Sequence, residues 1–348
     1  MGRSTVGKSY LPIVLNCDNF PYDIQPSELY YQLFLAGDSH PHGYMLPETV
    51  AKMPWTSSFI VSHDQPRSVT VQDSSHGSNS VAAFTSAFKE LVDICVEKDI
   101  FRVIDKQHSE LFPLVSYRST SSAASSPTLP VSANSKRRPN PPITIERYAA
   151  SLFGITLQGA HMIAFVRSRA TEDDSGVISG LWIPRRAANI WSSPNMLDAT
   201  VAGGITADLS PLETIIKEAG EEASISPELV RTRIKSTGML TYVSVTSAKH
   251  GWPGESGLVI PDMVYTYEIE LPNDVEPKPH DGEVGSFRLM NVGDVQSALL
   301  AGEFKPDAAI VVVDFLIRHG VITAENEREF VHINMHLHRR LPFRIASG

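Results

Sequence analysis

Residues 203–225 read GGITADLSPLETIIKEAGEEASI, a stretch that predicts a loop followed by an acidic helix. Serine caps helix starts and proline suits the first helical position, so Ser210 and Pro211 mark the expected beginning of the helix. Three carboxylates then recur at i, i+3 and i+4 and share one helical face: Glu218, Glu221 and Glu222. Like charges at this spacing repel one another, so a cation is expected to neutralise them.

Metal binding is the chemistry that these carboxylates favour. Hard oxygen ligands suit Mg²⁺ or Mn²⁺, and Mg²⁺ commonly shares its coordination with water and substrate phosphates. The alternative is a solvated acidic helix face, the usual explanation of such a run. The order of features favours a site, because a glycine pair, a loop and a capping serine precede the carboxylates, and Glu213 stands one turn before Lys217.

This loop–helix arrangement resembles the Nudix box, the signature of hydrolases that act on nucleoside diphosphates linked to other groups and on related diphosphates. The family pattern is G, five residues, E, seven residues, then R-E-apolar-x-E-E-x-G-apolar. Gly203 lies fifteen residues before Glu218, as the pattern requires, and Lys217 replaces its arginine. The chain departs from the pattern at the first glutamate, the apolar position and the late glycine: Leu209, Ala219 and Ser224. The supporting acid is therefore lost or moved to Glu213, and a degenerate scaffold is the main competitor of a working site.

Longer stretches resemble one Nudix subfamily, the fungal and plant group labelled thiamin pyrophosphokinase-related. Two blocks of the first half are similar to the uncharacterised domain that precedes Nudix in that group: 17–23 and 42–50. The other blocks fall in the second half: 181–186, 194–205, 217–225, 277–284, 302–323 and 338–343. Despite the label, the resemblance implies hydrolysis of oxothiamin and oxythiamin diphosphates to monophosphates, which clears damaged cofactor. Ile190 and Asn195 depart from the lysine and glycine that this group tends to have.

The resemblance also implies roles for individual residues. The three box glutamates would be catalytic and would hold the metal, helped by Glu283 in the loop HDGEVGSF and by the carbonyl of Gly203. Substrate contacts would come from a diphosphate clamp, a stacking ring, the helix cation and the second glycine: Arg185, Arg186, Trp182, Lys217 and Gly204. Bland alternatives stand beside these roles, because arginine pairs often form surface salt bridges and most tryptophans fill cores.

Composition sets limits on the whole chain. Its 348 residues are long enough for two domains, and 42% hydrophobic and 20% charged residues are ordinary for a soluble protein. A net charge of −9 argues against electrostatic binding of nucleic acid. The two cysteines, Cys17 and Cys95, indicate a reducing compartment, and neither a signal peptide nor a membrane span is expected, so the cytosol is the predicted location.

We expect an α+β protein in which a Nudix α/β/α sandwich with a mixed sheet follows a small α+β domain. The predicted division is an accessory domain over 1–116, a Ser/Pro-rich linker over 117–142 and the Nudix domain over 143–348. Within 151–168 the pattern predicts two strands with a turn near Gly159, and strands are also expected near 180–187, 238–247 and 262–271. Late helices are expected at 294–304 and 308–320.

The predicted function is that of a Mg²⁺- or Mn²⁺-dependent diphosphate hydrolase with a small-molecule substrate. Two alternatives remain open: a hydrolase of nucleoside diphosphate derivatives such as ADP-ribose, and a non-catalytic binding protein on a Nudix scaffold. Leu209 and Ser224 motivate the second alternative.

Overall fold

The structure is a computed structural model that describes residues 8–104, 110–117, 141–168, 176–248 and 252–345. Its main sheet has six strands, in the order β10 (Lys235–Val245), β11 (Val259–Glu270), β7 (Leu157–Ser168), β8 (Val177–Arg186) and β12 (Val284–Met290), while β9 (Val201–Gly204) pairs with β7. Strands β11 and β7 run parallel and the other pairs are antiparallel, so the sheet is mixed.

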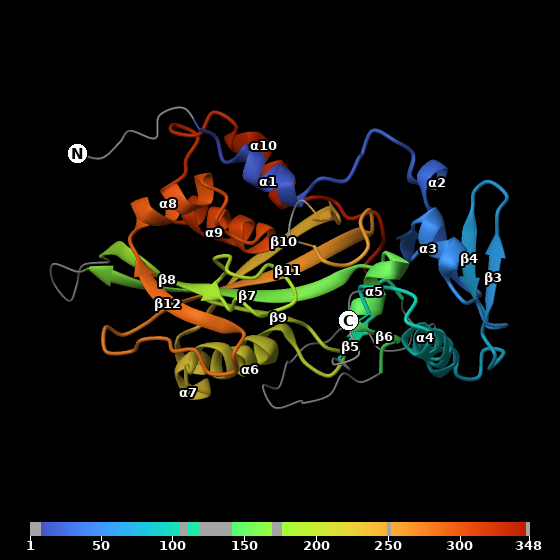
Figure 1. Cartoon of the computed structure of the whole chain (residues 1–348). Coiled ribbons are helices and arrows are strands. Elements are labelled where there is room, and N and C mark those ends of the chain that lie inside the picture. Colours follow the sequence, from blue (N-terminus) through green and yellow to red (C-terminus); the bar gives the residue numbers. More distant parts are fainter. Residues whose placement is uncertain (1–7, 105–109, 118–140, 169–175, 249–251, 346–348) are drawn as a thin grey trace, which may run out of the picture.

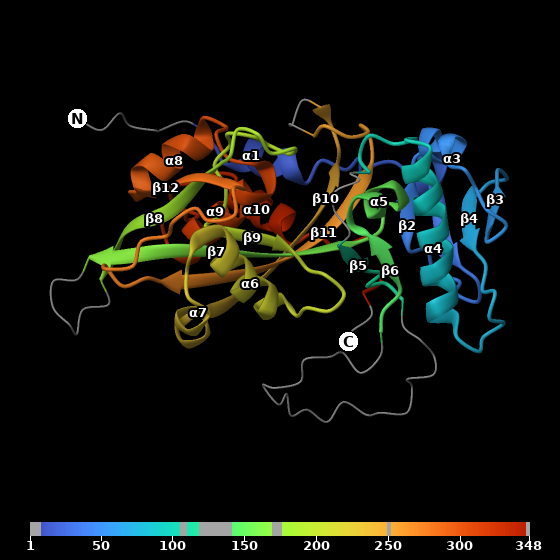
Figure 2. The same cartoon turned by 60° about the horizontal axis from the view of Figure 1, so that its bottom comes forward.

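Helices cover both faces of this sheet (Figure 1). One face carries α6 (Pro211–Ala223) and α7 (Pro227–Arg233). The other face carries α1 (Leu11–Cys17), α8 (Val292–Leu300), α9 (Pro306–Arg318) and α10 (Phe330–Leu337), as Figure 2 also shows. This arrangement is the predicted α/β/α sandwich with a mixed sheet.

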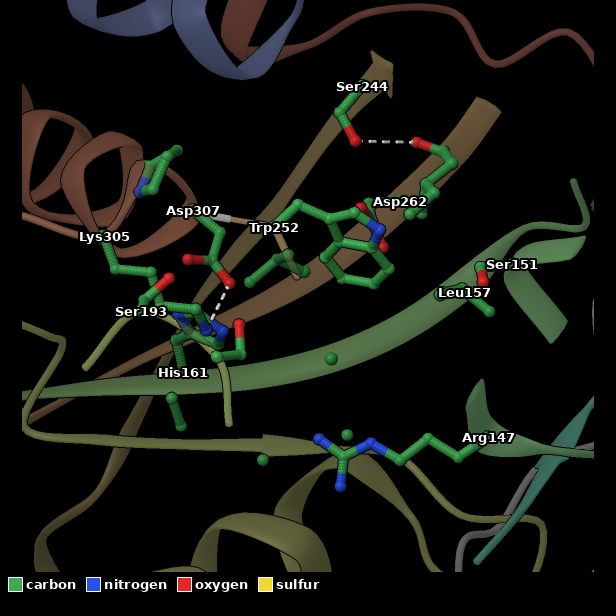
Figure 3. Close-up of a pocket in the computed structure, with 18 of the residues that line it drawn as sticks. Arg147, Ser151, Leu157, His161, Ser193, Ser244, Trp252, Asp262, Lys305 and Asp307 are labelled. Atoms are coloured by element: carbon green, nitrogen blue, oxygen red, sulfur yellow. Dashed lines mark hydrogen bonds and ion pairs between the residues drawn. The ribbon is translucent and has the colours of Figure 1, made fainter. Parts of the chain in front are cut away.

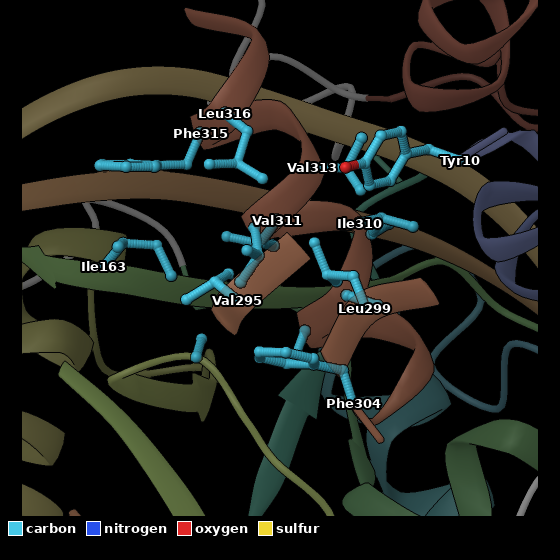
Figure 4. Packing of buried hydrophobic residues seen from close by; sticks show 14 of the residues in the cluster. Tyr10, Ile163, Val295, Leu299, Phe304, Ile310, Val311, Val313, Phe315 and Leu316 are labelled. Atoms are coloured by element: carbon cyan, nitrogen blue, oxygen red, sulfur yellow. The ribbon is translucent and has the colours of Figure 1, made fainter. Parts of the chain in front are cut away.

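The alternation of side chains along β7 connects the two halves of the sandwich. Ala160 and Met162 pack into the core beneath α6, whereas Ile163 and Phe165 pack into the core beneath α9. Figure 4 shows this second core, in which Ile163 of the sheet lies under side chains of α8 and α9. Such two-sided burial explains why the strand is apolar almost throughout, since neither face is left to solvent.

The first part of the chain forms a second α+β unit. Its four-stranded sheet has the order β2 (Gly43–Met45), β1 (Tyr31–Leu35), β4 (Ser68–Val71) and β3 (Phe59–Ser62). Its helices are α2 (Pro26–Leu29), α3 (Pro47–Lys52) and α4 (Ser80–Glu97). Phe84, Phe88 and Leu91 of α4 recur at helical spacing and are fully buried in its core.

The two parts are joined by residues on either side of the predicted linker. Strand β5 (Leu111–Pro113) pairs with β6 (Thr144–Glu146), and β6 leads into α5 (Arg147–Ala150) and the short 3₁₀ helix η2 (Ser151–Phe153). Phe153 packs with the core of the first unit. Most of the linker, 118–140, lies outside the described residues, and the domain boundaries stay a prediction.

The turn predicted near Gly159 is wrong. Residues 157–168 form one continuous strand, and Gly159 pairs with Gly204 of β9 inside the sheet. The glycine that reverses the chain is Gly154, whose φ of 62° ends η2 and whose missing Cβ leaves room for the Tyr44 carbonyl. Residues 151–153, before Gly154, form the 3₁₀ helix η2. The range 151–168 therefore contains one strand, β7, where the pattern predicts two. The other predicted strands and helices of the second half are present. None of the described helices combines the length and the apolar character that crossing a bilayer requires.

Candidate active site on helix α6

Helix α6 begins where the sequence predicts. The Ser210 hydroxyl accepts the N–H of Glu213 at 3.2 Å, and the Glu213 carboxylate accepts the N–H of Ser210 at 3.1 Å, so the two residues form a capping box. Glu213 is thus committed to the helix start and does not line the cavity described below. It does not replace the supporting acid that is missing at Leu209.

The end of the helix explains the late glycine of the pattern. Ser224 adopts the left-handed conformation, with φ at 54°, and its N–H donates to the Ala219 carbonyl. Glycine takes this conformation without a steric penalty, whereas serine pays for it in backbone strain. The Ser224 hydroxyl donates to the Lys278 carbonyl at 3.0 Å, which holds the residue in place. The departure from the pattern therefore leaves the helix geometry intact.

The three glutamates occupy different environments on one turn. Glu222 is buried, with 7% of its surface exposed, and accepts the N–H of Ala202 in β9 at 3.1 Å. The Glu218 side chain lies against Gly203, where a Cβ would approach its Cγ to 2.5 Å. Glu221 is exposed. Gly203 is required because β9 and α6 approach so closely that no side chain fits between them.

Burial makes this carboxylate cluster costly to ionise. It raises the pKa of Glu222 well above the usual range, and the nearby Asp198, Glu218 and Glu283 charges add to the increase. Burial also raises the pKa of Glu218, although the Lys217 ammonium opposes the change. A cluster of this kind retains negative charge that one lysine only partly compensates.

Lys217 supplies the positive charge in this structure. Its Nζ lies 3.0 Å from Glu218 and 2.9 Å from Glu221. With the side chains so placed, no three acidic, histidine or cysteine groups among the described residues converge as metal ligands do. The donor set nevertheless suits a hard divalent cation, because it consists of carboxylates on one helical turn, one of them buried and without a cationic partner of its own among the described residues.

The glutamates open into a cavity of about 700 Å³, a volume typical of small-molecule sites. Most of the predicted site residues line it: Gly203, Gly204, Lys217, Glu218, Glu221, Glu222, Glu283 and Arg186. Gly204 is packed against Phe112, whose ring would lie 2.4 Å from a Cβ at this position. Glu283 lines the cavity from the loop before β12, where its N–H donates to the Asp281 carboxylate.

Two predicted site residues lie elsewhere, Arg185 and Trp182. Arg185 is partly exposed and donates to the Asn195 carbonyl at 2.6 Å and to Glu303 at 3.3 Å. Neighbouring residues of a strand point to opposite faces, so Arg185 and Arg186 do not both reach the cavity. Trp182 packs against the core beneath α6. The structure thus brings one of the two arginines to the cavity and leaves Trp182 in a core.

Arg186 is itself held by a carboxylate. Its guanidinium donates to Asp198 at 2.8 Å and to the Ser192 carbonyl at 3.2 Å. Asn195, where the subfamily tends to have glycine, has a φ of 61°, a conformation that asparagine tolerates better than most residues. Asn195 therefore takes a backbone conformation that glycine also adopts readily.

The aromatic wall of the cavity is formed by other tryptophans than Trp182, the one chosen from the sequence. Trp191 and Trp252 line it and meet edge to face, with ring centroids 5.7 Å apart, while Tyr148 packs against Trp191 at 5.5 Å. These rings come from segments far apart in the chain, so no local pattern indicates that they meet.

A first missed group is the ion pair of Arg147 with Glu110, 2.7 Å apart. Both residues line the cavity, and Arg147 extends toward β9 on the α6 side of β7 in Figure 3. The pair forms because β5 and β6 meet across the predicted linker. Glu110, from before the predicted linker, thereby holds the Arg147 cation at the cavity wall.

A second missed group lies on the other side of β7, beneath the start of α9. His161 is 5% exposed, and its Nδ1 is buried without a hydrogen-bond partner among the described residues. Lys305 and Asp307 form an ion pair of 2.8 Å beside it, and Asp262 of β11 faces the same space (Figure 3). We call these four residues and Trp252 the α9 end of the cavity, and the box glutamates with Gly203 its α6 end.

Comparisons with known proteins find relatives that are named Nudix hydrolases. No family model matches the chain. The uncharacterized protein YJR142W of Saccharomyces cerevisiae is 38% identical over 205 residues, which are 58% of this chain and 58% of the relative. Nudix hydrolases 20 and 24 of Arabidopsis thaliana, both chloroplastic by name, are 35% and 34% identical over 184 residues, or 53% of this chain and 45% and 46% of theirs.

Among solved structures, DR0079 from Deinococcus radiodurans has 21% identity and a TM-score of 0.32, covering 45% of this chain and 82% of that one. The dihydroneopterin triphosphate pyrophosphohydrolase of E. coli has 12% identity and a TM-score of 0.32, covering 46% and 95%. Scores of this size establish no shared fold by themselves. The chain spans about half the length of the curated relatives it matches. By sequence, it is similar to plant proteins named Nudix hydrolases, which supports the resemblance that the box carries.

Proposed function

We propose that this chain is a diphosphate hydrolase of the Nudix type that requires Mg²⁺ or Mn²⁺. The observation that carries the proposal is the α6 end of the cavity, where Glu222 is buried against β9 and Glu218 lies against Gly203. The similarity to plant Nudix hydrolases supports the same conclusion. On a solvated acidic helix face the glutamates would be exposed. Here Glu222 is buried, and Gly203 leaves room for the Glu218 side chain.

The box glutamates would hold the metal, with Glu283 and the Gly203 carbonyl as further ligands. A bound divalent cation neutralises diphosphate charge and lowers the pKa of a water ligand. One of the glutamates accepts the proton of the attacking water. Arg147 and Arg186 line the same cavity and offer guanidinium groups to phosphate oxygens, in place of the pair first predicted. Lys217 balances the helix charge, as its two ion pairs do here.

The proposed substrates are diphosphates of oxidised thiamin, which the cleavage converts to monophosphates. The subfamily resemblance supports this substrate class, and the aromatic wall formed by Trp191 and Trp252 suits a flat heterocycle. A nucleoside diphosphate derivative such as ADP-ribose is the second candidate, because the plant relatives carry only the general family name. The cytosolic location and a small-molecule substrate without nucleic acid or membrane remain predictions.

The test is product formation with Mg²⁺ from oxothiamin, oxythiamin and thiamin diphosphates and from ADP-ribose, for the wild type and Glu222→Gln. Turnover of the thiamin compounds that the substitution abolishes is the expected result. Glu213→Gln is the matched control, because glutamine also completes a capping box and Glu213 does not line the cavity.

Turnover of ADP-ribose alone would keep the hydrolase and overturn the thiamin assignment. Binding of the thiamin compounds without turnover of any substrate would favour the non-catalytic scaffold, which Leu209 and the engaged Lys217 also suggest.

A further inference from the structure

The α9 end of the cavity has one carboxylate without a cationic partner. Lys305 is paired with Asp307 at 2.8 Å, and Arg186 is paired with Asp198 at 2.8 Å. Among the described residues Asp262 forms no such ion pair, and the Tyr242 hydroxyl lies near its carboxyl. The carboxylate oxygens of Asp262 are therefore available as hydrogen-bond acceptors for a ligand in the cavity.

The strands fix the direction in which Asp262 points. Asp262 pairs with Tyr242 of β10 and with Leu157 of β7, and Val264, two residues on, packs into the core beneath α9. Because residues two apart on a strand share a face, Asp262 lies on the same side of the sheet as His161. Trp252 lines the same cavity.

A second observation marks this end as built for a ligand. His161 lines the cavity, and the Nδ1 of its buried imidazole has no hydrogen-bond partner among the described residues. Buried polar groups are nearly always hydrogen-bonded, so an imidazole nitrogen left without a partner beside a cavity indicates a group that the ligand supplies. His161 and Asp262 lie on the same face of the sheet and line the same cavity as Trp252.

We propose that the α9 end binds the nitrogen heterocycle of the substrate and that Asp262 distinguishes a ring bearing an amino group from one bearing an oxo group. This inference rests on the proposed hydrolase function, in which the diphosphate occupies the α6 end. A carboxylate only accepts hydrogen bonds and so pairs with an amino group, whereas a carboxylic acid donates one and pairs with an oxo group. The protonation state of one side chain thereby selects between the two rings.

The surroundings of Asp262 allow both states near neutral pH. Burial, together with the Asp307 charge, raises the pKa of Asp262 to about 7. The titratable groups that face it are Tyr242 on β10, Cys17 on α1, and Lys305 and Asp307 at the start of α9. The Tyr242 hydroxyl and the Lys305 charge oppose the increase in this pKa. The preferred ring is thus expected to change from the oxo form at low pH to the amino form at high pH.

Thiamin and oxythiamin monophosphates are suitable probes, because they differ only in the amino or oxo group of the pyrimidine. Their dissociation constants would be measured by calorimetry between pH 6 and pH 8.5. For the wild type we expect the affinity ratio of the amino to the oxo ligand to rise about tenfold over this range, the scale of one charge-assisted hydrogen bond.

In Asp262→Asn the amide donates and accepts at every pH, so the ratio is expected to stay constant. Asp274→Asn is the matched control, since Asp274 is exposed in the loop after β11 and does not line the cavity. A thermal melt of each variant shows whether it is folded.

A ratio that does not change with pH in the wild type, or that changes equally in Asp262→Asn, would overturn the inference. Hydrolysis of the corresponding diphosphates, measured in parallel, separates this failure from a failure of the proposed function. If the diphosphates are hydrolysed while the ratio is flat, the hydrolase stands and the ring subsite is wrong. If neither monophosphate binds and no diphosphate is hydrolysed, both are wrong.

Discussion

The two ends of the cavity handle buried charge in different ways. At the α6 end three glutamates on one helical turn share a single lysine, so negative charge remains in excess. At the α9 end Lys305 and Asp307 neutralise each other, and the uncompensated group is the single carboxyl of Asp262. An excess of carboxylates suits a divalent cation, while one carboxyl in a paired environment suits a hydrogen-bonding ligand. The comparison suggests that one cavity separates the chemistry of the phosphates from the recognition of the ring.

The largest expected effect is on the α6 end. Glu222→Gln keeps the shape of the side chain and removes a metal-binding charge, so product formation should fall by about 10²–10⁴-fold. Mg²⁺ should also raise the melting temperature of the wild type more than that of the variant, because a ligand stabilises the state that binds it. Equal activity of the two proteins would show that the buried glutamate has no part in the reaction.

At the α9 end, Asp262 should make the free energy of unfolding depend on pH. The pKa of Asp262 is raised from its ordinary value of 3.8 to about 7, so the folded state binds more protons than the unfolded state between these values. Stability attributable to this group is therefore present at pH 4 and is lost as pH rises toward 7, by about 2–4 kcal/mol.

The asparagine of Asp262→Asn does not ionise. The free energy of unfolding of this variant in urea should therefore not show the loss between pH 4 and pH 7 that Asp262 causes. Asp274→Asn should retain it. If the pH dependence of the unfolding free energy is the same in the wild type and in Asp262→Asn, the pKa of Asp262 is not raised in the folded state.

Two glycines of the α6 end should respond with opposite signs. In Gly203→Ala the new Cβ meets Glu218 at 2.5 Å, so unfolding free energy should fall by about 1–3 kcal/mol and activity should fall with it. In Gly220→Ala the nearest atom is the Ile225 carbonyl oxygen at 4.0 Å, and alanine favours the helix by about 0.5–1 kcal/mol. Urea titrations of both variants measure the difference, and a Gly203→Ala variant as stable as the wild type would contradict the close approach of β9 to α6.

The smallest expected effect concerns the end of the box helix. Ser224→Gly relieves the left-handed strain but loses the bond to the Lys278 carbonyl, so we expect a net gain of about 0.5 kcal/mol. Ser224→Ala keeps the strain and loses the same bond, and it should cost about 1 kcal/mol. A loss of stability in both variants would show that the hydroxyl bond, and not the backbone, decides the outcome.

The contrast between the ends also explains what the sequence could predict. The α6 end is local: Ser210 caps the helix, and the spacing of the three glutamates fixes their common face, so both follow from residues 203–225. The position of β9 against α6 follows less directly, although the glycine pair is a signal of close approach. Most of the strands and helices were also predictable, because their apolar periodicity reflects the two cores.

The α9 end could not be predicted in the same way. His161, Asp262 and Lys305 come from β7, β11 and the start of α9, and only the pairing of the strands brings them together. The two arginines also could not be told apart from the sequence. Arg185 and Arg186 are neighbours in the chain, and only the structure shows that Arg186 lines the cavity. Gly159 was misread since a glycine inside a strand and a glycine in a turn look alike until their neighbours are known.

The pairing of β5 with β6 has a consequence for chain length. Leu111 lies opposite Glu146 and Pro113 opposite Thr144, so the residues that flank the stretch 117–142 are held side by side. The entropic cost of closing a loop grows only with the logarithm of its length, by about 0.6 kcal/mol for each doubling. Insertions or deletions between these two strands should therefore leave Glu110 and Arg147 in register at the cavity wall, and this stretch is the place where the chain tolerates a change in length at the lowest cost.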